Sequence, residues 1–333
     1  MPITVDFSRS PTAKEKMKLQ GRAHRLGRPD YARRLRHAYD VMPGALPLTG
    51  LKLRSGFAFR IDEIDHDSSD RKAPPRHFRP PATRLQSPRG ANLRFELSLI
   101  ALAQSVRRPG DKAKLNTLGL KVKGSSRAPG WADLLVADSE DGVLGSTFVT
   151  ARDKRTRSVR SSFEALQRAG LVGIPGVPGE RDRFERFVLL NEQGVEAIGE
   201  AEEYTVPTRD EEMFVMPAGF VTNGWVHVLE DSEIALLLMV GCRKGGWPEG
   251  DLLVIPPDVR LRQYGIHRDA YSAARKTLEW FGLLRVEEVG RHGDGRAENG
   301  ELRVHRLGLE VGGFDRPAIE TVARALQEQL ARR

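Results

Sequence analysis

The sequence predicts an α+β fold in which a unit of helices followed by a β-hairpin occurs twice, behind a basic N-terminal arm. Three observations lead to this prediction. The order of helical and strand-like segments in the first half recurs in the second half. A glycine ends a long helix at the same place in both copies, and the excess positive charge lies at the N-terminus. The length of 333 residues agrees with about two domains.

The positive charge is concentrated in the first quarter of the chain. The net charge is +8, but residues 1–90 hold 19 Lys and Arg against 9 Asp and Glu, a net charge of +10. Residues 91–333 hold 34 against 36, a net charge of −2. We expect residues 1–90 to be a basic arm and linker, partly disordered, that follows an anionic partner. A solubilising tail and a partner-binding segment are the alternatives.

The first block, residues 91–195, combines three predicted helices with a hairpin. It contains an amphipathic helix over 91–107, a short helix over 131–138, a basic helix over about 154–169 that ends at Gly170, and strands at 171–174 and 186–190. An acidic linker, residues 196–212, is expected to follow.

The second block, residues 213–311, repeats this order. It contains a helix over about 230–241 capped by Glu230 or Asp231, a short helix over 255–265, a helix over 267–281, and a hairpin of 283–289 with 301–307. Aligning Gly170 with Gly282 places AGLVGI over FGLLRV. This match indicates an internal duplication with an offset of about 112 residues.

The order of helix, helix–turn–helix, Gly-Leu and hairpin resembles the winged-helix DNA-binding fold. The segments EDSEIALLLMVGCR and IPPDVRLRQYGIHRDAYSAARKTLEWFGLLRVEE carry this resemblance. They are similar to the winged helices of bacterial transcriptional regulators and of plasmid replication initiators, which often carry two in tandem. The resemblance implies two tandem winged helix-turn-helix domains that bind double-stranded DNA. It favours transcriptional regulation; a plasmid or phage replication initiator and a protein-interaction scaffold are the alternatives.

Helical geometry separates core residues from candidate DNA contacts. Val159, Phe163 and Leu166 fall on one side of the first basic helix, so the opposite side is expected to face the major groove. The candidate DNA-binding residues on the two helices are Lys154, Arg155, Arg157, Arg160, Ser161, His267, Arg268, Ser272 and Lys276. The hairpins add Arg181, Arg183, Arg291, His292 and Arg296. Solvated surface charge is the alternative interpretation of these residues.

Enzyme and membrane classes are not predicted. The sequence has no phosphate-loop, dinucleotide, zinc-protease or serine-hydrolase motif, so neither catalysis nor a cofactor is expected. The single cysteine, Cys242, excludes an intramolecular disulfide and a cysteine zinc cluster. The acidic cluster 62–70 lacks the spacing of a calcium loop and is expected to be solvated. The longest aliphatic run, 234–240, is too short for a membrane span, so we expect a cytoplasmic, nucleoid-associated protein.

The C-terminal segment, residues 312–333, predicts a helix with Asp315 as its N-cap. The apolar residues of this helix form one stripe that either packs on its own domain or forms a homodimer; they are Ile319, Val322, Leu326 and Leu330.

Overall fold

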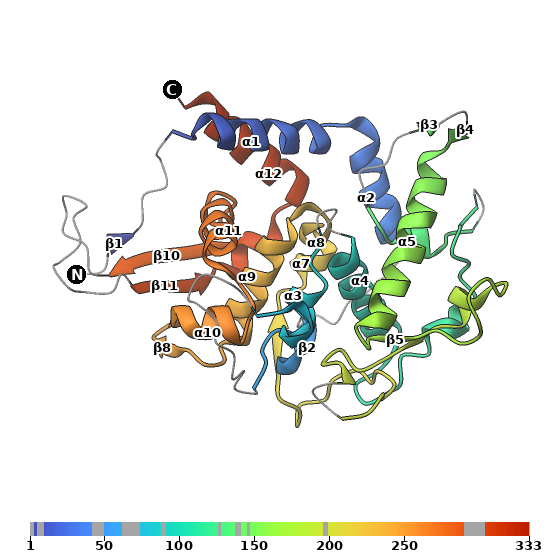
Figure 1. Cartoon of the computed structure of the whole chain (residues 1–333). Coiled ribbons are helices and arrows are strands. Elements are labelled where there is room, and N and C mark those ends of the chain that lie inside the picture. The colour runs from blue at the N-terminus through green and yellow to red at the C-terminus, as the bar shows by residue number, and fades with distance from the viewer. Residues whose placement is uncertain are drawn as a thin grey trace.

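Two helices that are buried along almost their whole length lie at the centre of the molecule, α4 (Asn92–Val106) and α9 (Asp231–Cys242) (Figure 1). From Phe95 to Gln104 every side chain of α4 is buried, whereas the sequence predicts an amphipathic helix there. Other parts of the chain therefore cover the face that a surface helix would expose to water. The computed structural model describes residues 3–4, 10–41, 50–61, 74–87, 91–125, 128–136, 141–144, 147–195, 199–289 and 304–332. The fold is mixed α+β, as predicted.

The second block is organised around an antiparallel sheet. After α9 come β8 (Trp247–Glu249), β9 (Leu252–Val254), α10 (Pro257–Arg262), α11 (Arg268–Trp280), β10 (Leu284–Val289) and β11 (Val304–Leu309). The sheet has the order β1-β10-β11-β9-β8, with β1 (Ile3–Thr4) at one edge. Strands β10 and β11 pair along their whole lengths, which confirms the predicted hairpin. On its other side β11 pairs with β9, so the strand before α10 and the hairpin belong to one sheet.

The first block also ends in a long helix and a hairpin, but it differs from the second block in the elements before that helix. Its last helix is α5 (Ala151–Arg168), followed by the short paired strands β5 (Val172–Gly173) and β6 (Val188–Leu189). Between α4 and α5 lie the 3-10 turn η4 (Trp131–Asp133) and the hairpin of β3 (Gly142–Leu144) and β4 (Thr147–Val149). Of the helix predicted over 131–138, the described residues 131–136 form only one turn, whose first two amides donate to the carbonyls of Lys121 and Val122.

Gly170 and Gly282 end α5 and α11 in the same way. Both have a positive φ, +70° and +65° respectively. In each turn the glycine amide donates to the carbonyl three positions back, and the next amide donates to the carbonyl five positions back. This Schellman turn needs the left-handed conformation that glycine adopts without strain. The alignment of the two blocks at these glycines therefore agrees with their backbone geometry.

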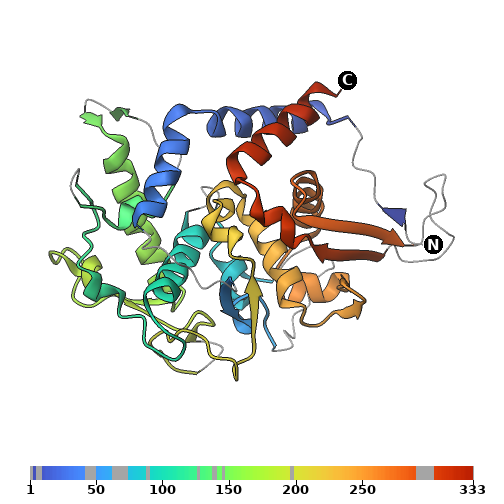
Figure 2. The same cartoon turned by 180° about the vertical axis from the view of Figure 1, so that it is seen from behind.

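The N-terminal segments are folded onto both blocks, which differs from the predicted arm. These segments are α1 (Ala13–Leu26), α2 (Pro29–Val41), β2 (Leu51–Arg54) and α3 (Pro81–Arg84). Helix α1 lies along α12 (Ala318–Ala331) across one side of the molecule (Figures 1 and 2). Strand β2 pairs antiparallel with β7 (Met213–Met216). Their apolar side chains join the common core because they occur at helical or strand spacing within the basic sequence; among them are Leu19, Leu26, Leu35, Leu51 and Leu53.

The described part of the acidic linker, residues 199–212, also packs against the first block. Tyr204 is fully buried, and its amide and carbonyl bond to the chain at Leu189 and Ala113. The remaining short elements are η1 (Ser55–Phe57), η2 (Arg76–Phe78), η3 (Leu115–Leu118), η5 (Arg183–Arg186), η6 (Val311–Asp315), α7 (Gly219–Thr222) and α8 (Trp225–Val228). None of the described helices is long and apolar enough to cross a membrane.

The C-terminal stripe is used within the protomer. Val322 and Leu326 are buried, and Ile319 and Leu330 pack half-buried against the same core. Helices α1 and α8 lie against α12 and cover this stripe, which agrees with the alternative that the helix packs on its own domain. The helix begins after Pro317, and Asp315 lies in the preceding turn rather than at the N-cap.

A buried ion pair joins α1 to α9. The guanidinium of Arg22 donates to both carboxylate oxygens of Glu233, at 2.6 and 2.8 Å, and to the carbonyl of Val228. Glu233 also accepts from the amide of Glu230, the N-cap residue of α9, and from the hydroxyl of Thr277 in α11. Three helices therefore meet at one carboxylate.

An Arg22→Met variant removes this pairing and leaves Glu233 buried without its cation. We expect the free energy of unfolding to fall by about 3–5 kcal/mol, measured by urea denaturation. Arg25→Met is the matched control, because Arg25 makes an exposed ion pair with Glu230 and its loss should cost at most about 1 kcal/mol. Equal effects of the two substitutions would contradict the role given to Arg22.

A second group of buried ionisable side chains includes Glu96 of α4. Glu96 is fully buried, and neither of its carboxyl oxygens has a hydrogen-bond partner among the described residues. The nearby Glu192 pairs with Arg54 of β2 at 2.8 Å. Burial, and after it the charge of Glu192, raises the pKa of Glu96 well above its usual value of 4.5. The folded protein therefore holds a proton on Glu96 that the unfolded chain releases.

A Glu96→Gln variant carries no such proton. In the wild type, the folded state binds the proton more tightly, so the free energy of unfolding falls as the pH rises from 4.5 towards the raised pKa, by about 1.4 kcal/mol per pH unit. We expect urea unfolding of the variant to depend less on pH across this window. Glu164→Gln, on the exposed face of α5, should keep the wild-type profile. A variant profile identical to that of the wild type would exclude titration of Glu96.

Candidate nucleic-acid interface

The side of α5 that faces away from the core carries three of the predicted DNA contacts. Arg157, Arg160 and Ser161 are all exposed there. The predicted core positions of the helix are buried on the opposite side, namely Val159, Ser162, Phe163 and Leu166. The Thr150 hydroxyl caps the first turn by accepting from the amide of Asp153 at 3.1 Å. The local pattern of the sequence therefore places this basic face as predicted.

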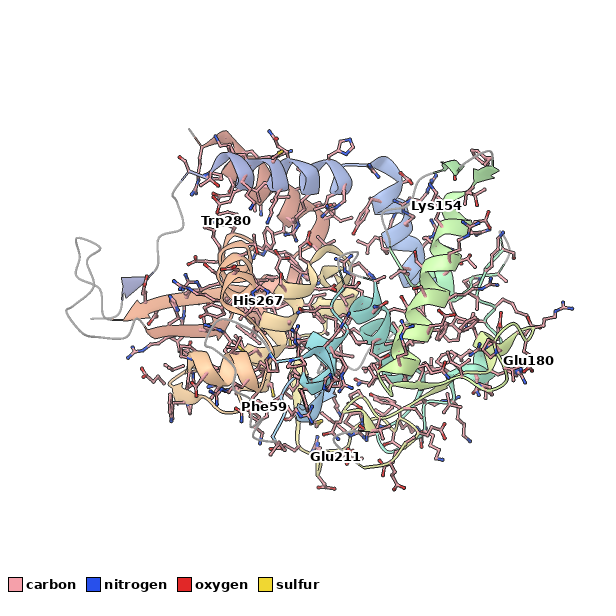
Figure 3. The ribbon with its side chains drawn as sticks, viewed as in Figure 1. Phe59, Lys154, Glu180, Glu211, His267 and Trp280 are labelled. Carbon is pink, nitrogen blue, oxygen red and sulfur yellow. The ribbon has the colours of Figure 1, made fainter. Side chains whose placement is uncertain are left out.

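Two arginines of this face are available to a ligand. Within the described part of the chain, no carboxylate forms an ion pair with Arg157 or Arg160. Glu164 is exposed one turn after Arg160 and reduces the positive charge towards the end of the helix. Lys154 is half-buried, at the end of α5 that lies beside α2 (Figure 3). The cationic part of the face is thus the first half of α5.

Arg155 points to another side of the helix. Its side chain is 12% exposed, and its guanidinium lies 4.0 Å from the carboxylate of Asp133. Burial lowers the pKa of Arg155 below its usual value, and the neighbouring charges of Arg34 and Arg152 lower it further. Arg155 therefore belongs to a hollow between α2 and α5 and not to the exposed face where the sequence placed it.

This hollow joins the N-terminal segment to the candidate helix. It has a volume of about 690 Å³ and is lined by Asp30, Arg33, Arg34, Arg36, His37, Asp133, Asp141, Ala151, Arg152 and Arg155. The sequence analysis did not assign the residues of α2 to a site. The run ARRLRH at 32–37 was the available signal for these residues. Its basic side chains flank Leu35, a pattern typical of a helix with a buried leucine and basic exposed sides.

The first hairpin supplies one exposed arginine instead of two. Arg181 is exposed, whereas Arg183 is buried with its guanidinium 5.1 Å from the ring centre of Phe184. Arg186 forms an ion pair with Glu180, which Figure 3 shows at the far side of α5 from α2. Arg183 is thus packed inside the protein and not on the exposed surface of the hairpin where the sequence analysis placed it.

The second candidate helix, α11, presents a smaller basic face. His267 caps the helix by accepting from the amide of Ala270, and Arg268 and Ser272 are exposed. Lys276 donates to the carboxylate of Glu15 in α1 at 2.8 Å, so it is already paired. The hydrogen bond from Lys276, followed by that from the amide of Thr12, lowers the pKa of Glu15 to about 2. The available contacts of α11 are therefore those near its N-terminus.

The two candidate helices lie on opposite sides of the central helices (Figures 1 and 2). The remaining predicted contacts, Arg291, His292 and Arg296, lie outside the described residues, as does the acidic cluster 62–70. Within the described ranges, no group of three His, Cys, Asp or Glu side chains could hold a metal ion. Comparisons with protein-family models, with curated proteins and with solved structures give no match.

The difference in burial between Arg181 and Arg183 can be tested by measuring the free energy of unfolding of two variants. Arg183→Ala removes a buried cation–π contact and the packing of its aliphatic stem, so we expect a loss of about 1–2 kcal/mol in the free energy of unfolding. Arg181 lies two residues away, and its side chain is 94% exposed. Arg181→Ala should therefore leave the free energy of unfolding unchanged. A destabilised Arg181→Ala protein with an unaffected Arg183→Ala protein would reverse the assignment.

Proposed function

We propose that this chain binds double-stranded DNA and that α5 is the helix that enters the major groove. The observation that carries the proposal is the exposed basic face of Arg157, Arg160 and Ser161, opposite the buried stripe of the same helix; no carboxylate of the described residues forms an ion pair with its arginines. The guanidinium of an arginine can donate two parallel hydrogen bonds to a guanine edge or to a phosphate, and a serine hydroxyl can bond either.

The arrangement of the second block supports a winged-helix origin. Apart from the additional strand β8 after α9, the order α9, β9, α10, α11, β10, β11, with β9 paired to β11, is the order of helices and strands expected of that fold. We propose that the second block is a winged helix. The first block is then a reduced copy that keeps its last helix, the glycine turn and a short hairpin. The tandem arrangement expected from the sequence remains part of this proposal.

Helix α11 supplies a second contact in this proposal. Arg268 and Ser272 are exposed near its N-terminus, where recognition helices contact base edges. Lys276 is excluded from this set because Glu15 neutralises it. The two helices lie on opposite sides of the molecule, so one straight duplex segment would not serve both at once (Figures 1 and 2). We therefore assign the main contact to α5.

Transcriptional regulation is the role that we propose for this DNA binding. A plasmid or phage replication initiator would use the same contacts on repeated sites at an origin. Selection of bound sequences from a random duplex library would distinguish the two roles, because an initiator would bind the repeats of a neighbouring origin.

Substitution of the exposed arginines tests the proposal. We expect Arg157→Ala and Arg160→Ala each to weaken binding to the selected duplex by about 1–3 kcal/mol if the side chain contacts a base, measured by fluorescence anisotropy. Arg324→Ala, which removes an exposed arginine on α12, is the matched control and should bind like the wild type. Unfolding curves should be alike for all three variants.

Two outcomes would contradict the proposal. If the wild-type protein binds neither random nor selected duplex at low salt, the chain is not a DNA-binding protein, and the protein-interaction scaffold becomes the better interpretation. If DNA binds but both substitutions behave like Arg324→Ala, another surface contacts the DNA.

A further inference from the structure

We propose that the hollow between α2 and α5 is a binding site for one phosphate group, supplied by the backbone of the DNA that α5 contacts. This inference rests on the proposed function and extends it to a part of the chain that the recognition-helix model does not use. A free phosphate, such as that of a nucleotide, offers the same chemistry, and the experiment below separates the two sources.

The charges that line the hollow are mostly positive. Five arginines and His37 face three aspartates across a volume of about 690 Å³. Without the histidine, the lining has a net charge of +2. Phosphate oxygens accept several hydrogen bonds at once, and the planar guanidinium group donates them in pairs. The composition of the lining therefore fits a phosphate better than a cation or an apolar ligand.

The three aspartates are already engaged with the protein. Asp30 accepts from Arg34 at 2.8 Å, and Asp141 accepts from the amide of Ala151 at the start of α5. Asp133 is buried; it accepts from the amide of Gly130 and lies within 4.0 Å of both His37 and Arg155. The carboxylates thus support the walls of the hollow and do not fill it.

Two arginines of α2 remain for a ligand. Arg33 and Arg36 are exposed at the hollow, and neither forms an ion pair with a described residue. They lie three positions apart, which places them on neighbouring turns of the same helix face. Arg152 donates to the carbonyl of Ser125, and no carboxylate of the described residues forms an ion pair with it.

The environment of Arg155 supports an anion in this place. The guanidinium is largely removed from water and lies near the positive charges of Arg34 and Arg152, which together lower its pKa. An anion in the hollow would reverse this repulsion, because an opposite charge nearby favours the charged form. The three aspartates of the lining leave a positive charge in the hollow that a bound anion would balance.

The hollow lies at the N-terminal end of α5, the end with which recognition helices approach the DNA. Ala151, Arg152 and Arg155 of the hollow come from the first two turns of α5 and lie on the side of the helix opposite Arg157, so the hollow and the exposed face share only this end of the helix. Contacts to phosphates on either side of a groove fix the position of a recognition helix without reading sequence. We assign this positioning role to Arg33 and Arg36.

The test compares the double variant Arg33→Ala/Arg36→Ala with the control Arg108→Ala/Arg324→Ala, which removes two exposed arginines elsewhere. Affinity for the selected duplex and for a random duplex is measured over a range of salt concentrations. If the hollow holds a backbone phosphate, the α2 variant should lose affinity equally for both duplexes, and its dependence of log K on log salt should fall by about 1 relative to the control. The substitutions leave Arg152 and Arg155 in place, and unfolding curves of both variants should match the wild type.

Pyrophosphate is the probe for a free ligand, titrated by isothermal calorimetry in the absence of DNA. Binding that the α2 variant loses and the control keeps, together with unchanged DNA affinity, would assign the hollow to a free phosphate compound. If the α2 variant equals the control in both assays, the hollow is not a phosphate site, although DNA binding through α5 would stand. If the wild type binds no duplex, the proposed function fails, and the pyrophosphate result alone decides whether the hollow binds phosphate.

Discussion

The ion pair of Arg22 with Glu233 is the constraint on which the arrangement of the helices depends. One carboxylate receives hydrogen bonds from α1, from the start of its own helix α9, and from Thr277 of α11. A charge removed from water is stable only while its partners remain in place. The three helices therefore depend on each other for their positions, and the basic N-terminus is fixed to the body by a charge as well as by its apolar side chains.

The basic surface follows from this anchor. Only two residues separate the end of α1 from the start of α2, so the position of α1 determines where α2 can lie. Helix α2 then lies beside α5 (Figure 1), and its arginines join those of the candidate recognition helix. The net charge of −2 for residues 91–333 does not describe this surface. Charge from two distant parts of the sequence is combined there by folding.

The sequence allowed prediction of features that depend on local spacing. The core stripe of α5, the glycine turns at Gly170 and Gly282 and the long hairpin of the second block all follow from patterns within about 20 residues. Arg155 and Arg183 were assigned to the interface because spacing does not reveal which neighbours cover a charged side chain. The hollow was missed for the same reason, since α2 and α5 are over 100 residues apart in sequence.

The antiparallel pairing of β2 with β7 has a consequence for the boundaries of the molecule. Strand β7 is central to the chain, yet its partner comes from the N-terminal quarter. A protein shortened to begin at residue 91 would lose this strand, the cation of the buried pair and the helix that covers α12. The N-terminal quarter is thus not a detachable extension. Evolution could have added or removed such a segment only together with changes in the core that it completes.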